Sequence, residues 1–391
     1  MGTETTGKMP CATGPLAGVK VIDITTVVMG PMAVQMLGDL GADVIKIEEP
    51  GGDMMRNLGL GPRSDMSGMA LNLLRNRRSI TVDMATPEGH KRVLQLTDQA
   101  DVVITNLRPK SLTNLGITGA ELRKRNPALI FCQAAGYPSD SPDANRPAYD
   151  DIIQSACGIA DTVSRVSGTP QIFPTIVADK VSALVISNAV TAALFHRERS
   201  DGKGQCIEVP MIDNMRWFLL QEHIAGAATE PPLSGAGYPR VLAANRKPHA
   251  TLDGWIGVLP YSDRNWRDFL NESGHPELVA DERFATVKGR LNNVEFVYGK
   301  LGDILRTRTT SEWVEFLDRL DIPASPVVTL DELVAGLPLE DHPHIGAYRV
   351  NTNPIRFEHT PVSLHQHAPL PGEHSELITV ALAEDPQWPA A

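Results

Sequence analysis

The chain has 391 residues, 42% of them apolar and 21% charged, which is typical of a globular protein of two or three domains. Acidic side chains outnumber basic ones by 47 to 36, and the net charge of −11 argues against a general binder of nucleic acid or of anionic membranes. No apolar run approaches ~18 residues, so the sequence predicts no membrane span.

The first residues and the cysteines indicate a cellular compartment. Residues 1–14 are polar and contain no apolar targeting segment, so secretion is not expected. The four cysteines lie far apart and form no CxxC pair; they are Cys11, Cys132, Cys157 and Cys206. A reduced, cytoplasmic protein is therefore expected.

Strand and helix patterns alternate through the first third of the chain. Apolar strands are expected at 19–25, 43–47, 79–84, 102–105 and 129–133. Helices are expected from Pro31 to Leu40, from Pro87 to Gln99 with Thr86 as N-cap, and over short stretches from Ser111 and Thr118. This alternation predicts an α/β fold with a mostly parallel, doubly wound sheet.

After the first third of the chain, the sequence predicts a linker, a second compact region and a proline-rich tail. Helices at 147–160 and 181–199 and a strand at 206–209 precede a Pro/Gly-rich linker or long loop at 225–250. A second compact region follows, with a strand at 255–258 and helices around Trp266 and over 294–320. Prolines are frequent after Pro323, so the tail is expected to pack on a surface rather than to form its own core.

Three familiar kinds of site find little support. Glu48 lies near the position at which dinucleotide-binding proteins have a ribose-binding acid. The glycine motif GxGxxG that should follow the first strand is absent, however, and only Gly30-Pro31 supplies a glycine there. No GxSxG elbow is present. The pairs His342/His344 and His365/His367 have metal-like spacing but lie in proline-rich sequence, so surface histidines and no metal site are expected.

Basic residues form local exceptions in this acidic chain. Arg108 and Lys110 follow the fourth expected strand and open a short helix. Ligands bind at the carboxyl ends of parallel strands, and cations at a helix N-terminus favour phosphates. A second basic run, 123–125, is equally consistent with a solvated charged face.

Asp179 is the most informative single acid in the sequence. It stands directly before a long helix, in FPTIVADK at 173–180. One interpretation is a helix N-cap. The other is a half-buried carboxylate, kept ionised by the helix dipole, that serves as a nucleophile.

Several segments together resemble the family III CoA-transferases, also called the CaiB/BaiF family. The family includes formyl-CoA transferase and, as a relative, α-methylacyl-CoA racemase. The resemblance is carried by 18–48, 77–86, NLRPKSLTNLG at 106–116, RPAYDDIIQSACG at 146–158, Ala178-Asp179, 192–211, ATLDGWIG at 250–257 and LPGEHS at 370–375. Their order and spacing make the match specific over most of the chain.

The resemblance implies a Rossmann-like large domain built from both chain ends, with a smaller inserted domain. Its limits would be 1–224 for the N-terminal part of the large domain, 225–329 for the small domain with linkers, and 330–391 for the returning part. It also implies a homodimer of two interlocked chains, with no nucleic-acid or membrane partner.

The resemblance further implies a CoA-transferase that moves CoA from an acyl-CoA to a free carboxylic acid. Asp179 matches the family's acyl-accepting aspartate, which would pass through a mixed anhydride and an aspartyl-CoA thioester. CoA or acyl-CoA would be a substrate, with no tightly bound cofactor. The expected CoA-pocket residues are Thr26, Val27, Asn106, Leu107 and Tyr137, with Arg108 expected to bind phosphate.

Two departures from the family pattern bear on the alternatives. Formyl-CoA transferase has His and Gln where this chain has Thr26 and Val28, which makes formyl-CoA/oxalate exchange doubtful. The racemase has a His where this chain has Tyr149, before Asp150. A Tyr with a pKa of about 10 is a poor base at neutral pH, so an acyl-CoA racemase or epimerase is disfavoured. A CoA-binding protein without catalysis, with Asp179 as a helix cap, is the remaining alternative.

Overall fold

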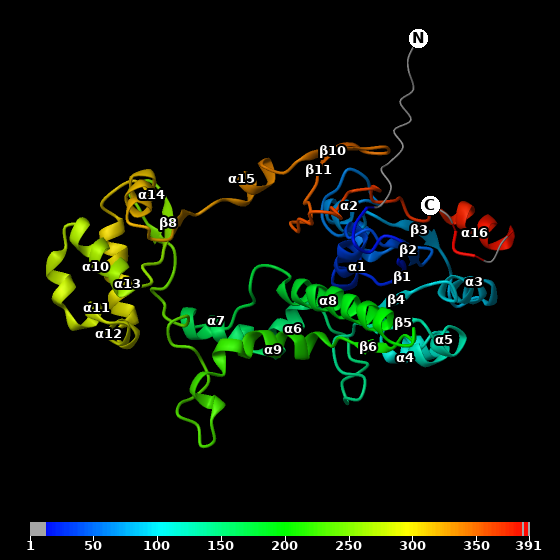
Figure 1. The fold of residues 1–391 in the computed structure, drawn as a ribbon, viewed down its shortest axis with the longest axis horizontal. Helices are drawn as coiled ribbons and strands as arrows, with labels where there is room; N and C mark the ends of the chain where they lie inside the picture. Colours follow the sequence, from blue (N-terminus) through cyan, green and yellow to red (C-terminus); the bar gives the residue numbers. More distant parts are fainter. Residues whose placement is uncertain (1–12, 385–386, 390–391) are drawn as a thin grey trace, which may run out of the picture. The chain divides into compact units, whose positions relative to one another are not determined.

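The computed structural model describes residues 13–384 and 387–389, so Cys11 lies outside the described residues. The chain divides into two compact units, each made of several segments (Figure 1). Unit 1 comprises 1–157, 173–218 and 338–391, and unit 2 comprises 158–172 and 219–337. The finer domain limits expected from the sequence stay a prediction.

Unit 1 is built on a six-stranded sheet in the order β3-β2-β1-β4-β5-β6. The strands are β1 Lys20–Ile24, β2 Asp43–Glu48, β3 Arg78–Thr81, β4 Val102–Thr105, β5 Ile130–Gln133 and β6 Cys206–Glu208. Every neighbouring pair is parallel, and Ile22 lies beside both Ile45 and Val103. The expected α/β class and parallel, doubly wound sheet are confirmed, and the order is that of a Rossmann sheet.

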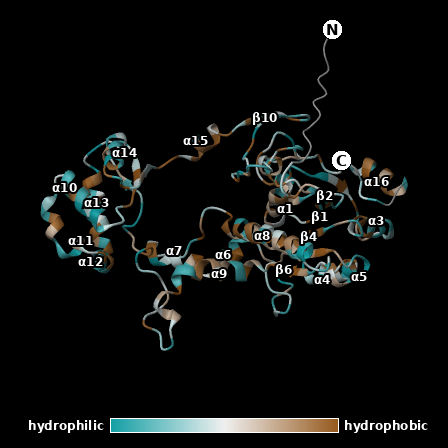
Figure 2. Cartoon of the chain, viewed as in Figure 1, coloured by the Kyte–Doolittle hydropathy of each residue, from teal (hydrophilic) through white to brown (hydrophobic). Residues whose placement is uncertain are grey.

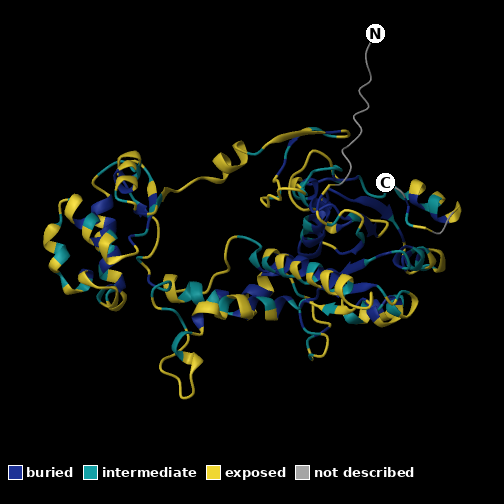
Figure 3. Cartoon of the chain, viewed as in Figure 1, coloured by how far each residue is buried: buried dark blue, intermediate teal, exposed yellow. Residues whose placement is uncertain are grey.

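The central strands are buried on both faces because helices cover them. β4 (VVIT) is entirely buried, and β1 (KVIDI) is buried except at Lys20, as central parallel strands require (Figure 3). The helices of unit 1 are α1 Met29–Asp39, α2 Gly68–Leu73, α3 Pro87–Thr97, α4 Pro109–Leu115, α5 Gly119–Arg125, α6 Asp150–Cys157, α8 Val177–Arg199 and α16 Ser375–Glu384, with the 3-10 turn η1 Met54–Asn57.

The local capping signals acted as expected in α3. Thr86 accepts a hydrogen bond from the Gly89 amide at 3.1 Å, with Pro87 at the first helical position. The helix expected at 147–160 is instead split, because Gly158 takes a φ of 105°. It separates α6 from α7 Ile159–Ser167, which belongs to unit 2. A helix that the sequence did not predict, α9 Met211–His223, follows β6.

Helix α8 starts earlier than expected, at Val177, so Asp179 is its third residue and not its N-cap. The helix is long and apolar enough to cross a membrane by length and composition alone, and hydrophobic residues recur along it in Figure 2. Half of that stretch is buried, and the helix packs on α1, α6 and β5. These contacts are typical of a core helix in an α/β domain.

The C-terminal segment returns to the sheet of unit 1. A hairpin of β10 Leu339–His342 and β11 Gly346–Arg349 precedes α16, which packs beside β3. The expectation of surface histidines is wrong for His342, which is 2% exposed. Its ring is enclosed by Tyr348 and His367, and its Nε2 lies 2.8 Å from the Ala368 carbonyl.

Unit 2 is a helical cluster on a small antiparallel sheet. The strands are β7 His249–Ala250, β8 Trp255–Val258 and β9 Ala324–Pro326, and the helices are α7, η2 Ala225–Ala228, α10 Asp263–Glu272, η3 Pro276–Ala280, α11 Glu282–Ala285, α12 Val287–Asn292, α13 Val294–Leu305, α14 Thr310–Arg319 and α15 Leu330–Ala335. Aromatic rings fill its core; Trp266, Phe269 and Trp313 are each at most 3% exposed. The expected compact region after the linker is therefore present.

Candidate active site

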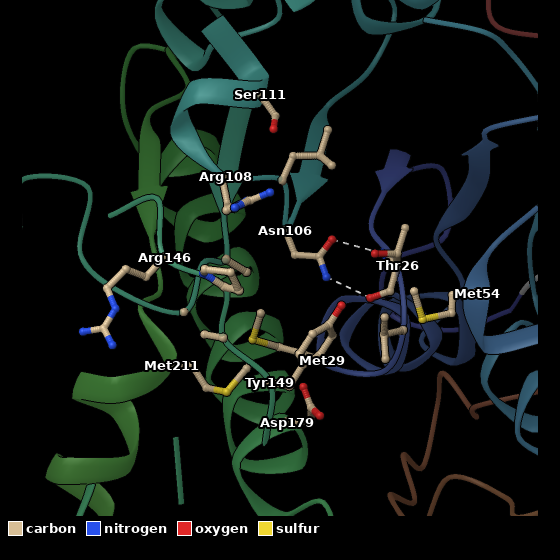
Figure 4. Close-up of a pocket in the computed structure, with 16 residues that line it drawn as sticks. Thr26, Met29, Met54, Asn106, Arg108, Ser111, Arg146, Tyr149, Asp179 and Met211 are labelled. Atoms are coloured by element: carbon tan, nitrogen blue, oxygen red, sulfur yellow. Dashed lines mark hydrogen bonds between the residues drawn. The ribbon is translucent and has the colours of Figure 1, made fainter. Parts of the chain in front are cut away.

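A cavity of about 270 Å³ opens at the carboxyl end of the sheet in unit 1. Its walls come from the segments that follow β1, β4 and β5, together with α8 (Figure 4). It is lined by Thr26, Val27, Met29, Met54, Asn106, Leu107, Arg108, Ser111, Ala134, Gly136, Arg146, Pro147, Ala148, Tyr149, Asp179 and Met211. This edge is where open α/β sheets bind their ligands.

The turn after β1 is held by side chains from two other segments. Asn106 accepts from the Thr26 amide at 3.0 Å and donates to the Thr26 carbonyl at 2.8 Å (Figure 4). The Asp53 carboxylate accepts from the Val27 amide at 3.0 Å and from the Met55 amide at the same distance. Val27 has a φ of 69°, which is strained for a β-branched residue and persists only where such contacts impose it.

A buried charge network lies beneath that turn. Lys46 donates to the Thr25 carbonyl at 2.6 Å and pairs with Asp53 at 3.0 Å, and Arg77 pairs with Asp23 at 2.6 Å. All of these charged groups are at most 2% exposed. Buried ion pairs resist rearrangement because removing one partner leaves an unpaired charge, so the network fixes the turn against the sheet.

Glu48, the acid considered for a ribose, is already occupied. Arg56 donates two hydrogen bonds to it, at 2.6 and 2.7 Å, and Ser79 donates a third. Burial alone would raise the pKa of Glu48, but the Arg56 hydrogen bonds and the charges of Lys46 and Arg56 outweigh it and lower the pKa to about 2. Both oxygens of Glu48 are therefore hydrogen-bonded within the chain, and the side chain stabilises the fold.

The basic side of the cavity is tied to a neighbouring loop. Arg108 is the N-cap residue of α4 and donates from Nη1 to the Asn145 carbonyl at 3.0 Å. The Asn145 side chain accepts from the Lys110 amide at 2.9 Å. The loop at 138–146 therefore packs against α4, and Arg146 at its end lines the cavity.

Asp179 lies at the opposite end of the cavity from Ser111, beside Tyr149 and Met29 (Figure 4). It is 9% exposed. Burial, and then the nearby charge of Asp150, raise its pKa from 3.8 to about 7, against a smaller lowering by a hydrogen bond from the Met29 backbone. The helix dipole was expected to keep this carboxylate ionised, but the loss of hydration on burial has the larger effect and raises its pKa instead.

Asp150 positions the start of α8. Its Oδ1 accepts from the amides of Ala178 and Asp179, at 2.6 and 3.2 Å, and Gln154 donates to its other oxygen. Ile176, the N-cap residue of α8, forms no side-chain cap, so a carboxylate from α6 satisfies the helix amides instead. This contact is the physical reason that α8 starts before Asp179.

The cavity gathers most of the residues singled out in the sequence. Asp179, Thr26, Val27, Asn106, Leu107 and Arg108 all line it. Tyr137 does not; it is 8% exposed, and Arg146 lies over its ring at 5.8 Å. The sequence reasoning missed Met54, Ser111, Arg146 and Met211, although Arg146 opens one of the recognised segments.

Within residues 13–384 and 387–389, no group of three or more His, Cys, Asp or Glu side chains is arranged to hold a metal ion. The polar groups at the cavity are one buried carboxylate, amides, hydroxyls and two arginines. Two guanidinium groups against one carboxylate suit an anionic ligand better than a cation.

The fold is that of a Rossmann-like α/β domain, with a cavity that contains two arginines and one buried carboxylate at the carboxyl end of its sheet. Residues 16–375 match the sequence model of the family "CoA-transferase family III". The chain belongs to that family and is a CoA-transferase acting on CoA thioesters.

Individual relatives cover nearly the whole chain. The "Probable fatty acyl-CoA transferase Rv3272" of Mycobacterium tuberculosis is 34% identical over 82% of this chain and 84% of its own length. The "Succinate--glutarate CoA-transferase" of Agrobacterium fabrum is 31% identical over 96% and 97%. A "Formyl-CoA:oxalate CoA-transferase" of Escherichia coli is 28% identical over 93% and 94%.

Solved structures agree with these sequence matches. The crystal structure of Rv3272 aligns with a TM-score of 0.80 at 30% identity, covering 94% of this chain and 99% of that one. A CaiB/BaiF family protein from Brucella suis aligns with the same TM-score and identity over 95% and 100%. The mixed α/β fold with its parallel sheet is therefore that of the family.

Proposed function

We propose that the chain transfers CoA from an acyl-CoA to a free carboxylic acid through covalent intermediates on Asp179. The observation that carries the proposal is the placement of this one carboxylate, 9% exposed, in the cavity at the carboxyl end of the sheet. A buried carboxylate has lost much of its hydration, so its deprotonated form is a stronger nucleophile than one in water.

The proposed cycle conserves the energy of the thioester at each step. A carboxylate oxygen of Asp179 attacks the thioester carbon, the C–S bond breaks, and CoA leaves as a thiolate from a mixed anhydride. The thiolate attacks the Asp179 carbonyl carbon and expels the donor acid as a carboxylate, which leaves an aspartyl-CoA thioester. The acceptor carboxylate then attacks that carbon, the C–S bond breaks, and CoA thiolate leaves from a second mixed anhydride between Asp179 and the acceptor. The thiolate attacks the acceptor's acyl carbon, which forms the new acyl-CoA and releases Asp179 as a carboxylate.

The cavity residues have separate roles in this proposal. Thr26, Val27, Asn106 and Leu107 contact the CoA moiety at the strand ends, and Arg108 binds a phosphate. Tyr137 supports the wall from beneath through Arg146. CoA enters as a substrate, and no cofactor is held between turnovers.

Racemisation at the α-carbon is the rival chemistry, and the cavity does not favour it. The residue before Asp150 is Tyr149, which lines the cavity and is 57% exposed. An exposed phenol is a poor partner base at neutral pH. Deuterium exchange at the α-carbon of the acyl-CoA is expected to be absent.

The test is an exchange assay with several acyl-CoA donors and a panel of carboxylates, read by mass detection of new thioesters. We expect Asp179→Ala to abolish exchange while CoA binding persists. Asp161→Ala is the matched control, since Asp161 is an exposed acid on α7 paired with Arg165, and it should retain full turnover. Full turnover by Asp179→Ala, or binding of CoA without any transfer by the wild type, refutes the proposal.

We further propose that the enzyme is an interlocked homodimer. Unit 1 exposes large apolar side chains at Leu184 (52%), Phe195 (65%) and Trp217 (63%), and unit 2 exposes Leu330 (80%) and Leu333 (57%). Exposed apolar surface of this kind is typical of subunit interfaces. The chain crosses between its units near residues 157, 172, 218 and 337, so several chain segments connect the two units.

We place the enzyme in the cytoplasm. The support is that Cys132 and Cys206 are free thiols in the described part of the chain. Free thiols are typical of proteins in a reducing compartment.

A further inference from the structure

Unit 2 contains a cavity of its own, of about 280 Å³, that the proposed transfer does not use. Its floor consists of buried side chains, Trp266 (3% exposed), Val297 (1%) and Tyr298 (7%). Its rim consists of exposed apolar side chains, among them Tyr261 (68%) and Leu291 (41%). The cavity is thus an open, mostly apolar pocket with four aromatic side chains, between α10, α12 and α13.

The charge of this pocket is positive. None of the described residues that line it is acidic, whereas two are arginines. Arg290 is neutralised, because it pairs with Asp263 and donates to the Phe284 carbonyl at 2.6 Å. Arg240 has no carboxylate within ion-pair distance among the described residues.

Arg240 is held at the pocket by aromatic groups instead. Its guanidinium lies 5.3 Å from the centre of the Tyr261 ring, and its Nη2 lies 3.5 Å from the Tyr298 hydroxyl. These contacts orient the guanidinium without neutralising it. It retains donors for a planar anion, and carboxylate is the anion whose geometry the guanidinium fork matches.

Size and lining restrict the ligand further. An apolar cavity of about 150 Å³ is large enough to bind benzene. A pocket of about 280 Å³ therefore holds one aromatic ring with a short carboxylate arm. A phosphate is a poor fit, because a dianion needs more donors than one guanidinium and gains nothing from aromatic walls.

We propose that this pocket binds a small aromatic carboxylic acid, with the carboxylate on Arg240 and the ring against Trp266 and Tyr298. The pocket shares no lining residue with the Asp179 cavity, and the proposal does not depend on the chemistry proposed there. An enzyme that exchanges carboxylic acids would thereby carry a second place at which such an acid is recognised.

The test is calorimetric titration of the full chain with phenylacetate in the absence of CoA. We expect saturable binding of one phenylacetate per chain. Phenylacetamide, which has the same ring and no charge, should bind at least about tenfold more weakly, since a hydrogen-bonded charge is lost. Equal binding of acid and amide would overturn the proposal, as would absence of saturable binding.

Variants locate the site. Arg240→Gln should weaken phenylacetate binding at least about tenfold. Arg267→Gln is the matched control, since Arg267 is an exposed arginine of α10 that does not line the pocket, and it should bind as the wild type does. Leu291→Trp fills the rim and should also block binding without lowering the melting temperature.

One more variant separates this proposal from the transfer mechanism. Asp179→Ala should bind phenylacetate as tightly as the wild type, because no residue of unit 1 lines this pocket. Wild-type affinity in Arg240→Gln, or loss of binding in Asp179→Ala, would assign the bound acid to another place and overturn the proposal.

Discussion

The surroundings of Asp179 have opposing effects on its pKa. Its burial makes the ionised form costly, and the nearby charge of Asp150 adds to that cost. The amide of Met29 stabilises the anion but does not compensate. The result is a carboxyl group with a pKa of about 7, which is poised between the proton-bearing form and the nucleophile near neutral pH.

The first prediction concerns the pH dependence of acylation. Only the deprotonated carboxylate attacks, so the rate of the first acyl transfer should fall about tenfold per pH unit below the Asp179 pKa of about 7. Single-turnover kinetics with one acyl-CoA across this range measure it. Asp150→Asn removes the like charge but keeps an oxygen for the helix amides, so its midpoint should move to lower pH. A flat profile in the wild type would contradict this account of Asp179.

The second prediction concerns stability. The folded-state pKa of Asp179 is raised above the unfolded value, so the folded chain keeps a proton that the unfolded chain releases. Stability is therefore lost as the pH rises toward 7. Asp179→Asn should unfold with ~1–3 kcal/mol more free energy than the wild type at about pH 8 and with no difference below about pH 4. Denaturant titrations measure this, and a destabilised Asn variant at about pH 8 would be contrary to expectation.

At the scale of elements, the turn between β1 and α1 is the part of the site most dependent on distant segments. Asn106, from the end of β4, supplies both of its hydrogen bonds to Thr26, and Asp53 supplies the bond to Val27. The strained φ of Val27 persists because these contacts hold it. The turn therefore keeps its shape before any ligand arrives, which reduces the ordering cost of binding.

The third prediction follows from this preorganised turn. Asn106→Ala removes two hydrogen bonds of about 1 kcal/mol each and should raise KM for the acyl-CoA about tenfold, with a smaller change in kcat. Asn126→Ala is a matched control, since Asn126 also bonds the backbone, donating to Ala100 at 2.9 Å and accepting from Ala128 at 3.1 Å. Both variants should lose similar stability, but Asn126→Ala should keep the wild-type KM. Equal KM values in the two variants would show that the turn does not contribute to acyl-CoA binding.

The sequence predicted those elements whose signals are local. The β1 strand and the Thr86-Pro87 start of α3 are each specified by residues within the element itself. The start of α8 was misplaced because its cap is Asp150, a residue of another helix. Helix α9 was missed because its apolar residues are not confined to one face: Met211, Ile212 and Met215 are buried, whereas Trp217 and Phe218 are exposed.

At the scale of the molecule, alternation of strands and helices was sufficient to predict the parallel sheet. The cavity was predicted only in part. Thr26, Asn106 and Arg108 follow strand ends, where ligands bind, whereas Met54 and Met211 reach the cavity through tertiary packing that no spacing reveals. The raised pKa of Asp179 was also beyond the sequence, since it depends on burial and on Asp150.

The fourth prediction concerns the assembly. Sedimentation should give twice the 42.4 kDa mass of one chain. Because interlocked chains cannot separate without unfolding, mixed tagged and untagged dimers should form no heterodimer over hours and should do so only after unfolding and refolding. A monomer mass would contradict the dimer, and rapid subunit exchange would contradict the interlocking.

The most direct test of the central claim is mass analysis of the protein after it is mixed with an acyl-CoA donor and quenched. The account predicts a peptide containing Asp179 that carries the mass of CoA as a thioester, or of the acyl group as an anhydride. Addition of an acceptor carboxylate should discharge the adduct as a new acyl-CoA. An enzyme that turns over while the Asp179 peptide stays unmodified, with the adduct on another residue, would contradict the account.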